Sequence, residues 1–428
     1  MTIESVTGTE QLIVMRFRHT SALNFVQRLY TEQPELADLP FFEQQKALDM
    51  FHLSFTGGLV AGLGKAGLSS LDIIYDVPQL QRAWERDTGI SLGTENRELA
   101  MAFSAMAELQ PSVILEQSFG LFRPPDLERI RRELPAVKLI TMHVGFPLVG
   151  YPVKFGQSPE YDIMFTTCSN FVEDFRSVGI RNVEVVPHGF DASVLDDLDV
   201  EGLRYPVSFA GSSGFGFGET HWSRYEYLDA LCARTPITCF LQEPEPDLAT
   251  LDTRNGGAER FLRSSKRLVK RAIRYQGRKV GLRTDLVNSP PRNWAPPSMP
   301  LKDKYPNKCR EAVFGLDMYS VLARSGITFH KGHDVEGSCS SALRLYEASG
   351  VGSMVLANAV AQMPNTLVPG KECVTYDSID DCVEKVRYLL DHEEERKAIA
   401  RAGQMRTLRD HTLDERALHF AEAFRRFL

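Results

Sequence analysis

Arg344 and Glu347 stand three positions apart in the stretch "ALRLYEASGVGSMVL". The pattern predicts the second half of a helix, a stop at Gly350 and Gly352, and a short buried strand. Upstream, "EGSCSS" (336–341) would leave the helix start open to a ligand. Free backbone N–H groups and the positive end of the helix dipole favour an anion there. A carboxylate one or two turns into the helix suits the paired hydroxyl groups of a ribose.

This layout favours a nucleoside diphosphate. Its phosphates would lie at the helix start, with Arg344 or Lys331 as counter-charge, and its ribose would lie on Glu347. Polar residues near the same helix start are further candidates: His330, His333, Ser340 and Ser341. The alternatives are an ordinary exposed loop and a surface ion pair, which would contribute only about 0.2–0.5 kcal/mol.

Other candidate residues follow predicted strands. Gly211 and Ser212 belong to the glycine-serine loop of "PVSFAGSSG" (206–214), whose backbone N–H groups could hold a phosphate. His143 ends the strand predicted over 137–143, and His188 lies in "VVPHG". For both histidines a purely structural role is the alternative.

Apolar runs alternate with amphipathic helical patterns in both halves of the chain. Alternation of this kind predicts parallel sheets covered by helices. The strands are predicted at 12–17, 71–76, 112–117, 137–143, 161–167, 183–189, 206–214, 237–242, 326–331 and 353–358. The helices are predicted at 21–30, 41–51, 58–67, 78–86, 96–109, 124–133, 169–178, 222–233, 340–349, 379–391 and 393–402, with Ser21 capping the first. Two Rossmann-like domains around a cleft follow from this pattern.

The totals exclude several classes of protein. The chain has 428 residues and a net charge of −7, so two domains and no nucleic-acid partner are expected. No apolar run is long enough to span a membrane, and the N-terminus lacks the pattern of a signal peptide. The seven cysteines are scattered without a CxxC pair. Reduced thiols, no metal site and a cytoplasmic location are therefore expected.

The segment 258–283 is strongly basic, with ten Lys or Arg and one acidic residue. Leu262, Val269 and Ile273 give it a narrow apolar stripe. It could lie on the anionic inner face of a membrane or hold an acidic acceptor, and a solvated helix face is the alternative. A proline-rich loop follows it.

Several short motifs occur in a consistent order. They comprise Arg344, Tyr346, Glu347, Ala348, Gly350 and Gly352; Pro369, Gly370, Glu372 and Tyr376; His392, Arg396, Ile399, Ala400 and Gly403; and His411 and Thr412. Earlier stretches agree, namely "LQRAW", "YDIMFTTCSNFVEDFRSVGI", "VVPHGFDASVL" and "FAGSSGFGFGETHWSR", the last with His221 and Arg224. Together they resemble group 1 glycosyltransferases, and most closely the branch of the spore-maturation protein CgeB. The resemblance covers nearly the whole chain except 243–305.

The resemblance implies the GT-B fold, an α/β architecture of two Rossmann-like domains whose parallel sheets face a central cleft. The acceptor-side domain would span 1–195 and the nucleotide-sugar domain 205–410, with a basic, proline-rich insertion at about 245–305. The final helix, 411–428, would pack back on the first domain. Arg224 would bind the donor, and His221 is a further candidate. Catalysis is assigned to His143, since a histidine in this region touches the donor sugar in related enzymes.

The implied reaction moves a sugar from a UDP- or GDP-sugar to a hydroxyl of a glycan, lipid-linked glycan, protein or metabolite. Retention of configuration and independence of metals and cofactors are expected, because helix dipoles and basic side chains can neutralise the leaving diphosphate. Many retaining members have a second glutamate eight residues before the one at Glu347, where this chain has Cys339. A nucleotide-sugar 2-epimerase-like enzyme and a non-catalytic scaffold for surface or spore-coat assembly remain alternatives.

Overall fold

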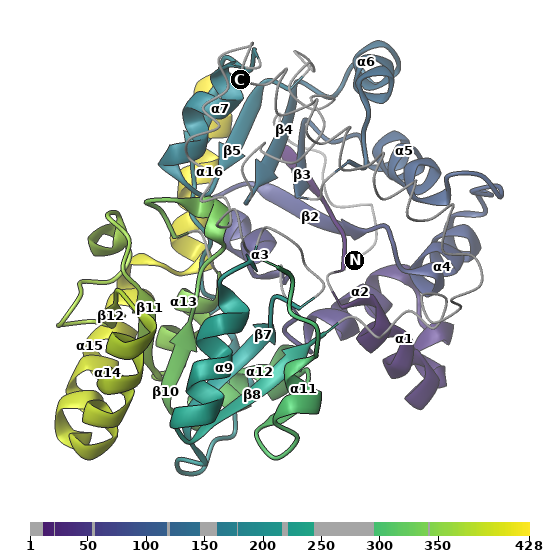
Figure 1. Cartoon of the computed structure of the whole chain (residues 1–428). Helices are drawn as coiled ribbons and strands as arrows, with labels where there is room; N and C mark the ends of the chain where they lie inside the picture. Colours follow the sequence, from purple (N-terminus) through teal and green to yellow (C-terminus); the bar gives the residue numbers. More distant parts are fainter. Residues whose placement is uncertain are drawn as a thin grey trace, which may run out of the picture.

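The computed structural model describes residues 12–20, 22–53, 56–117, 120–145, 161–177, 179–215, 221–243, 295–340 and 343–428. Two sheets, each flanked by helices, form the two halves of the molecule (Figure 1). The basic segment 258–283, Ser21 and Ser341 lie outside the described residues. Among the described helices, none has the length and apolar character needed to cross a bilayer.

The first sheet has the strand order β2-β1-β3-β4-β5-β6, and every neighbouring pair is parallel. Its strands are β1 (Ile13–Arg18), β2 (Ser69–Ile74), β3 (Val113–Gln117), β4 (Leu139–Val144), β5 (Ile163–Thr166) and β6 (Val183–Val185). The helices of this half are α1 (Leu23–Glu32), α2 (Phe41–Asp49), α3 (Gly58–Lys65), α4 (Pro78–Thr88), α5 (Arg97–Leu109), α6 (Pro124–Glu133), α7 (Val172–Ser177) and α8 (Val194–Asp197).

The second sheet is also parallel throughout, in the order β12-β11-β10-β7-β8-β9. Its strands are β7 (Tyr205–Ser212), β8 (Ile237–Gln242), β9 (Cys309–Glu311), β10 (Ser325–His330), β11 (Met354–Asn358) and β12 (Val374–Tyr376). The described helices that follow β7 in the sequence are α9 (Arg224–Arg234), α11 (Leu301–Lys304), α12 (Gly315–Ala323), α13 (Leu343–Gly350), α14 (Ile379–Asp391), α15 (Glu393–Asp410) and α16 (Leu413–Phe427).

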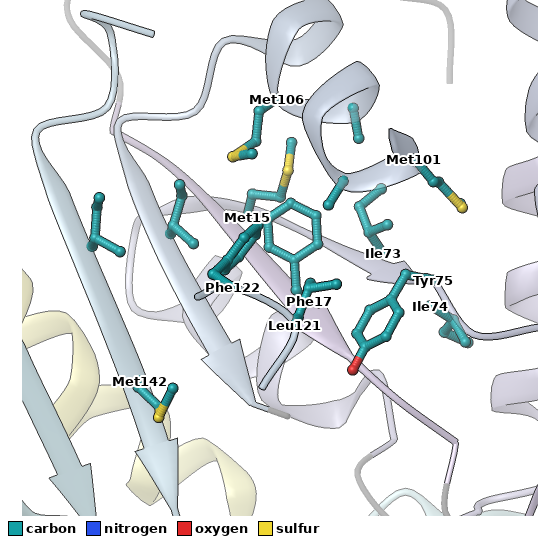
Figure 2. Packing of buried hydrophobic residues seen from close by; sticks show 14 of the residues in the cluster. Met15, Phe17, Ile73, Ile74, Tyr75, Met101, Met106, Leu121, Phe122 and Met142 are labelled. Atoms are coloured by element: carbon teal, nitrogen blue, oxygen red, sulfur yellow. The ribbon is translucent and has the colours of Figure 1, made fainter. Parts of the chain in front are cut away.

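Apolar side chains of β1 form the centre of the first core. Met15 and Phe17 are fully buried, and Figure 2 shows them packed with Phe122 beneath the helix that carries Met106. The rings of Phe17 and Phe122 meet edge to face with centroids 5.4 Å apart. Burial on both faces explains why the central strands are mostly apolar rather than alternating apolar and polar residues.

The last helix, α16, packs on the first half of the molecule although it follows the second half in sequence (Figure 1). Phe420 and Phe424 join the same buried cluster as Val14 and Leu59. A Cβ atom added to Gly62 of α3 would lie 2.8 Å from Cβ of Ala417, so the two helices need a residue without a side chain there.

The chain crosses between the two halves in two segments that lie side by side, one around Phe190 and the other around His411. They are called the crossing segments. Phe190 N donates to His411 O at 2.7 Å, and Leu413 N donates to Phe190 O at 2.9 Å. Phe190 is fully buried, and its ring occupies the space where Gly350 would otherwise carry a Cβ atom. Phe190 therefore packs the two crossing segments against the end of α13.

Several predicted elements differ from the observed ones at their ends, and five observed elements were not predicted, namely β9, β12, α8, α11 and α12. The strand expected over 183–189 ends at Val185, because the chain then turns into the crossing segment. The helix expected over 393–402 continues to Asp410, since buried contacts recur at Gly403 and Thr407. The first helix begins at Leu23 after Ala22, which makes no side-chain cap.

Candidate functional site

The carboxyl ends of both sheets face a common cleft that contains two cavities. In open parallel sheets this is the edge where ligands bind. The first cavity lies where β1, β3 and β4 end. The second, of about 200 Å³, lies where β7 and β8 end, and it is lined by Ala22, Leu53, Gly211, Gln242, Ala312, Val313, Phe314, Gly315, Met318 and Arg344. Leu53 lines both cavities.

Residues of both halves line the first cavity. From the first half come Arg16, Thr56, Leu59, Gln117, His143, Pro187, His188, Gly189 and Asp191. From the second half come Tyr319, Leu343 and Glu347, and the last helix adds Leu413, Arg416 and Phe420. The predicted residues His143, His188 and Glu347 are thus brought to one cavity by three distant parts of the chain.

Arg344 and Glu347 lie between the two cavities. Arg344 Nη1 is 2.7 Å from Glu347 Oε2, and Tyr319 Oη donates to Glu347 Oε1 at 3.4 Å. The Glu347 side chain is only 3% exposed and that of Arg344 is 23% exposed, so the carboxylate is buried while the guanidinium group is half-buried. Burial raises the pKa of Glu347, and the Arg344 charge and the Tyr319 hydrogen bond oppose that rise.

His143 is held by protein partners at both ring nitrogens. Arg16 Nη1 donates to Gln117 Oε1 at 2.9 Å, which turns the Gln117 amide so that its Nε2 donates to His143 Nδ1 at 3.1 Å. The other nitrogen, Nε2, then donates to Val186 O at 3.1 Å. Burial lowers the pKa of His143 to about 4. This histidine is therefore neutral, and its ring rather than a free nitrogen lines the cavity.

His188 lies near His143, with ring centroids 5.8 Å apart. Burial lowers the pKa of His188 to about 3, and the neighbouring His143 adds to the shift. Its backbone oxygen accepts a hydrogen bond from Arg416 Nε at 3.0 Å. His188 thus occupies the point where the first crossing segment meets the last helix.

Three of the residues predicted to bind the donor lie together in the structure, namely Arg224, Ser212 and Lys331. Arg224 Nη1 donates to Ser212 Oγ at 3.1 Å, and its Nη2 donates to Lys331 O at 2.7 Å. Burial lowers the pKa of Arg224 to about 10, although Glu336 and Asp334 oppose the shift. Its described hydrogen bonds all go to neutral oxygens. Lys331 Nζ, by contrast, is paired with Asp334 at 3.0 Å.

The loop before α13 gathers further polar residues. His333 Nδ1 lies 2.5 Å from Glu336 Oε1, and the His333 ring lies on that of His221 with centroids 4.3 Å apart. Burial lowers the pKa of His221, and it lowers the pKa of His330 to about 3. His221 and His330 are therefore neutral groups near Arg224.

Three buried polar atoms here have no hydrogen-bond partner among the described residues: Arg224 Nε, His330 Nε2 and Ser340 Oγ. Buried polar atoms are normally paired, so each of these atoms is available to a ligand or a water molecule. Gly211, another predicted donor-binding residue, lies near the end of β7 with a φ of +152°. It lines the second cavity.

Sequence reasoning missed a buried charge network in the first half. Arg16, 1% exposed, pairs with Asp72, while Arg18 Nε donates to Asp72 Oδ2 at 3.1 Å and also pairs with Asp49. Arg16 Nη2 donates to Thr56 O at 2.6 Å. The signal was present in "LIVMRFR" and "LDII", where charges interrupt apolar strands. Charges are rarely buried without partners, so paired charges in neighbouring strands could have been predicted.

The cysteines differ from expectation. The structure joins Cys168 to Cys339 in a disulfide, where reduced thiols were expected. The two residues are 171 positions apart, so only the fold reveals the pair. The thiols of Cys232, Cys239 and Cys309 also lie within 4.8 Å of one another, although no group of metal ligands was expected. Structural zinc sites have four ligands, and these three thiols are buried in the second apolar core, so we assign them to packing.

Two comparisons with known proteins agree with this geometry. Residues 254–422 match the family described as glycosyl transferase-like. Anabaena HepE, solved in complex with UDP and glucose, shares the architecture with a TM-score of 0.55 at 11% identity, over 97% of this chain and 100% of that chain. The fold is GT-B. Sucrose-phosphate synthase from Thermosynechococcus elongatus has the same fold, with a TM-score of 0.52 at 11% identity, over 97% of this chain and 99% of that chain. No curated protein matches the sequence.

Proposed function

We propose that this GT-B protein is a glycosyltransferase that takes a nucleotide-sugar donor in its second domain and a hydroxyl acceptor in its first. The observation that carries the proposal is the cleft between two parallel sheets, with Glu347 buried in it and with polar atoms of Arg224, His330 and Ser340 that have no partner in the described part of the chain. The glycosyl transferase-like match and the UDP complex of HepE support this choice of donor.

In the proposed mechanism, positively charged groups stabilise the diphosphate as it leaves. Arg224 is the most suitable, because its described hydrogen bonds go only to neutral oxygens. Lys331 and Arg344 already have carboxylate partners, so they would have to share or exchange them. Preorganised positive charge of this kind lowers the barrier without a metal, and we propose that the reaction is metal-independent and retaining.

We propose that His143 shapes the acceptor side of the sugar site through its ring. Because Gln117 and Val186 already engage its two nitrogens, His143 would have to lose a hydrogen bond before exchanging a proton with substrate. Assignment to the CgeB-like branch rests on the sequence motifs, and the branch does not define the acceptor.

Replacing Glu347 tests the donor site. Glu347→Gln keeps the shape but loses the charge that would accept both ribose hydroxyl groups. Charge-assisted hydrogen bonds contribute about 1.5–3 kcal/mol, so we expect the affinity for UDP to fall roughly 10- to 100-fold. The loss should be much smaller for 2′,3′-dideoxy-UDP, which has no hydroxyl groups to bind. Isothermal calorimetry with both nucleotides measures this difference.

Glu372→Gln is the matched control, since Glu372 is also buried but its carboxylate accepts from Val368 N outside both cavities. It should leave both affinities unchanged. Thermal melts of each variant separate loss of binding from loss of folding. Equal affinity of the native protein and Glu347→Gln for UDP would remove Glu347 from the site. If UDP fails to bind, a thermal-shift panel with GDP and ADP tests the base, since a ligand at 100-fold its Kd adds about 2.7 kcal/mol.

Incubation with UDP-sugars distinguishes the two other functions. A 2-epimerase-like enzyme would convert its donor without any acceptor, whereas a scaffold would bind nucleotide and turn over nothing. Release of UDP that depends on an added hydroxyl acceptor supports the proposed transferase.

We propose in addition that the basic segment 258–283 holds the protein at an anionic membrane surface. The ten positive charges in its sequence carry this proposal. Replacing Arg267, Lys270 and Arg271 with glutamine should weaken sedimentation with phosphatidylserine vesicles, and salt should reduce the difference. Absence of vesicle binding by the native protein would overturn it.

A further inference from the structure

Cys168 and Cys339 belong to different domains. Cys168 follows β5 of the first sheet, and Cys339 lies in the loop that precedes α13 of the second. Their Cα atoms are 6.1 Å apart, which is a normal separation for a disulfide. The bond therefore spans the cleft between the two domains.

The surrounding polar contacts also connect the two domains. Ser169 Oγ donates to Gln362 Oε1 at 2.9 Å, and Asn170 Nδ2 donates to Ser338 Oγ at 2.9 Å and to Glu336 O at 3.1 Å. Cys168 and Cys339 are 1% and 6% exposed, whereas Ser169 and Ser338 beside them are exposed. The sulfur atoms thus lie just beneath exposed residues of both domains, which form the rim of the cleft.

The loop that carries Cys339 also carries the residues proposed to bind the donor. Lys331 and Ser340 lie within ten residues of Cys339 on this loop, and Glu347 follows on α13. In the part of the chain that the structure describes, the covalent path between the domains otherwise runs through the crossing segments at Phe190 and His411. A bond at Cys168 adds a further connection, on the loop itself.

We propose that Cys168 and Cys339 form a reversible oxidative modification site that locks the cleft closed. Its reactants are low-molecular-weight disulfides and dithiols. When the domains separate, one cysteine thiolate attacks a small disulfide R–S–S–R, forms a mixed disulfide and releases one thiol R–SH. Closure then brings the second cysteine to the mixed disulfide, where it displaces the second R–SH. The protein dithiol is oxidised, the small disulfide is reduced to two thiols, and a dithiol reverses the reaction.

The consequence is control of ligand entry and release. Hydrogen bonds across the rim can break and re-form as the domains move, but the disulfide cannot. The oxidised protein should therefore keep the closed form, and the reduced protein should open. This inference does not rest on glycosyl transfer, because the lock would act on any ligand of the cleft.

The first experiment uses the native full-length protein after treatment with oxidised glutathione or with dithiothreitol. Non-reducing peptide mapping should find a peptide pair that joins Cys168 to Cys339 only after oxidation. Hydrogen exchange should be slower in 163–171 and 331–340 of the oxidised form. Failure to form the linked peptides, or identical exchange in the two forms, would overturn the proposal.

Variants identify the cysteines responsible. Cys168→Ser and Cys339→Ser should each abolish the difference between oxidised and reduced protein, and Cys168→Ala repeats the test if serine impairs folding. Cys373→Ser is the matched control, because Cys373 is a buried free cysteine whose Sγ lies near Leu367 O rather than at the rim. It should retain the full difference. Loss of the difference in Cys373→Ser would assign the effect to another thiol.

Stopped-flow binding of UDP tests the functional effect. Association that requires domain opening should be slower by at least about tenfold in the oxidised form, and Cys168→Ser should bind equally fast in both. Equal association rates of UDP with the oxidised and the reduced native protein would overturn the proposed control of ligand entry. If neither form binds UDP, the proposed donor fails, whereas the hydrogen-exchange result still decides whether the lock exists.

Discussion

Burial decides the charge state of the individual side chains in the cleft. His143 and His188 are neutral because burial disfavours their charged forms, and Gln117 presents a donor to His143 where a protonated ring would need an acceptor. Glu347 keeps a close cationic partner in Arg344. The cavity thus combines neutral imidazoles on one side with a paired carboxylate on the other.

The neutral state of His143 predicts a dependence of stability on pH. Its pKa is about 4 in the folded protein and near 6.5 when unfolded, so the unfolded chain binds the extra proton between these values. The contribution of His143 is fully present above pH 6.5 and is lost as the pH falls toward 4. His143→Gln removes this contribution. Between pH 6 and 5 the unfolding free energy of the native protein should fall more steeply than that of the variant, by about 1.4 kcal/mol per pH unit at most.

Urea denaturation at pH 7, 6 and 5 measures both slopes. Glu116, whose pKa burial raises to about 7, acts in the opposite direction, so the difference between variants is more informative than the slope of the native protein. The exposed residue His419 provides the control substitution His419→Gln. Parallel slopes for the native protein and His143→Gln would contradict the neutral assignment.

Helix α13 is positioned by the close approach of the crossing segment. A Cβ atom at Gly350, the last residue of this helix, would lie 2.6 Å from ring atoms of Phe190. Phe190 is fully buried and is held by hydrogen bonds to the second crossing segment, so it has little room to move. The glycine that ends α13 is therefore required by packing as well as by helix termination.

Gly350→Ala should destabilise the protein by about 1–3 kcal/mol, which is typical of overpacking in a core. Gly64→Ala is the matched control, because Gly64 lies in α3 with no heavy atom within 4 Å of the added Cβ. That change should be neutral or stabilise by up to about 1 kcal/mol through the higher helix propensity of alanine. Urea midpoints compare the two variants directly. A loss at Gly64 equal to that at Gly350 would show that the Phe190 contact is not the cause.

When the Cys168–Cys339 disulfide is reduced, the two domains remain connected by two adjacent chain crossings and by α16, which packs on the first domain after the second is complete. Contacts of this kind allow rotation of one sheet toward the other without unfolding either. Residues from both domains line the first cavity, so a ligand bound there contacts both. Closure around a ligand is the expected motion.

Bound nucleotide should therefore slow hydrogen exchange on both sides of the crossing segments. We expect protection in 331–340 and at the carboxyl ends of β3 and β4, measured by mass spectrometry with and without UDP on the reduced protein. Helix α6, on the outside of the first domain, serves as the internal reference and should not change. Protection limited to residues after 205 would exclude closure while leaving donor binding in place.

Local patterns were sufficient to predict the two parallel sheets, most helices and the stop at Gly350, because periodicity and glycine act over a few residues. They also indicated Lys331 and Glu347 as candidates for a nucleotide site, and the family resemblance added Arg224. The pairing of Arg16 with Asp72, the neutral His143 and the Cys168–Cys339 bond could not be obtained in this way. Each depends on which atoms of distant segments meet and on how much water is excluded there. Only the packing of the two domains and α16 determines both.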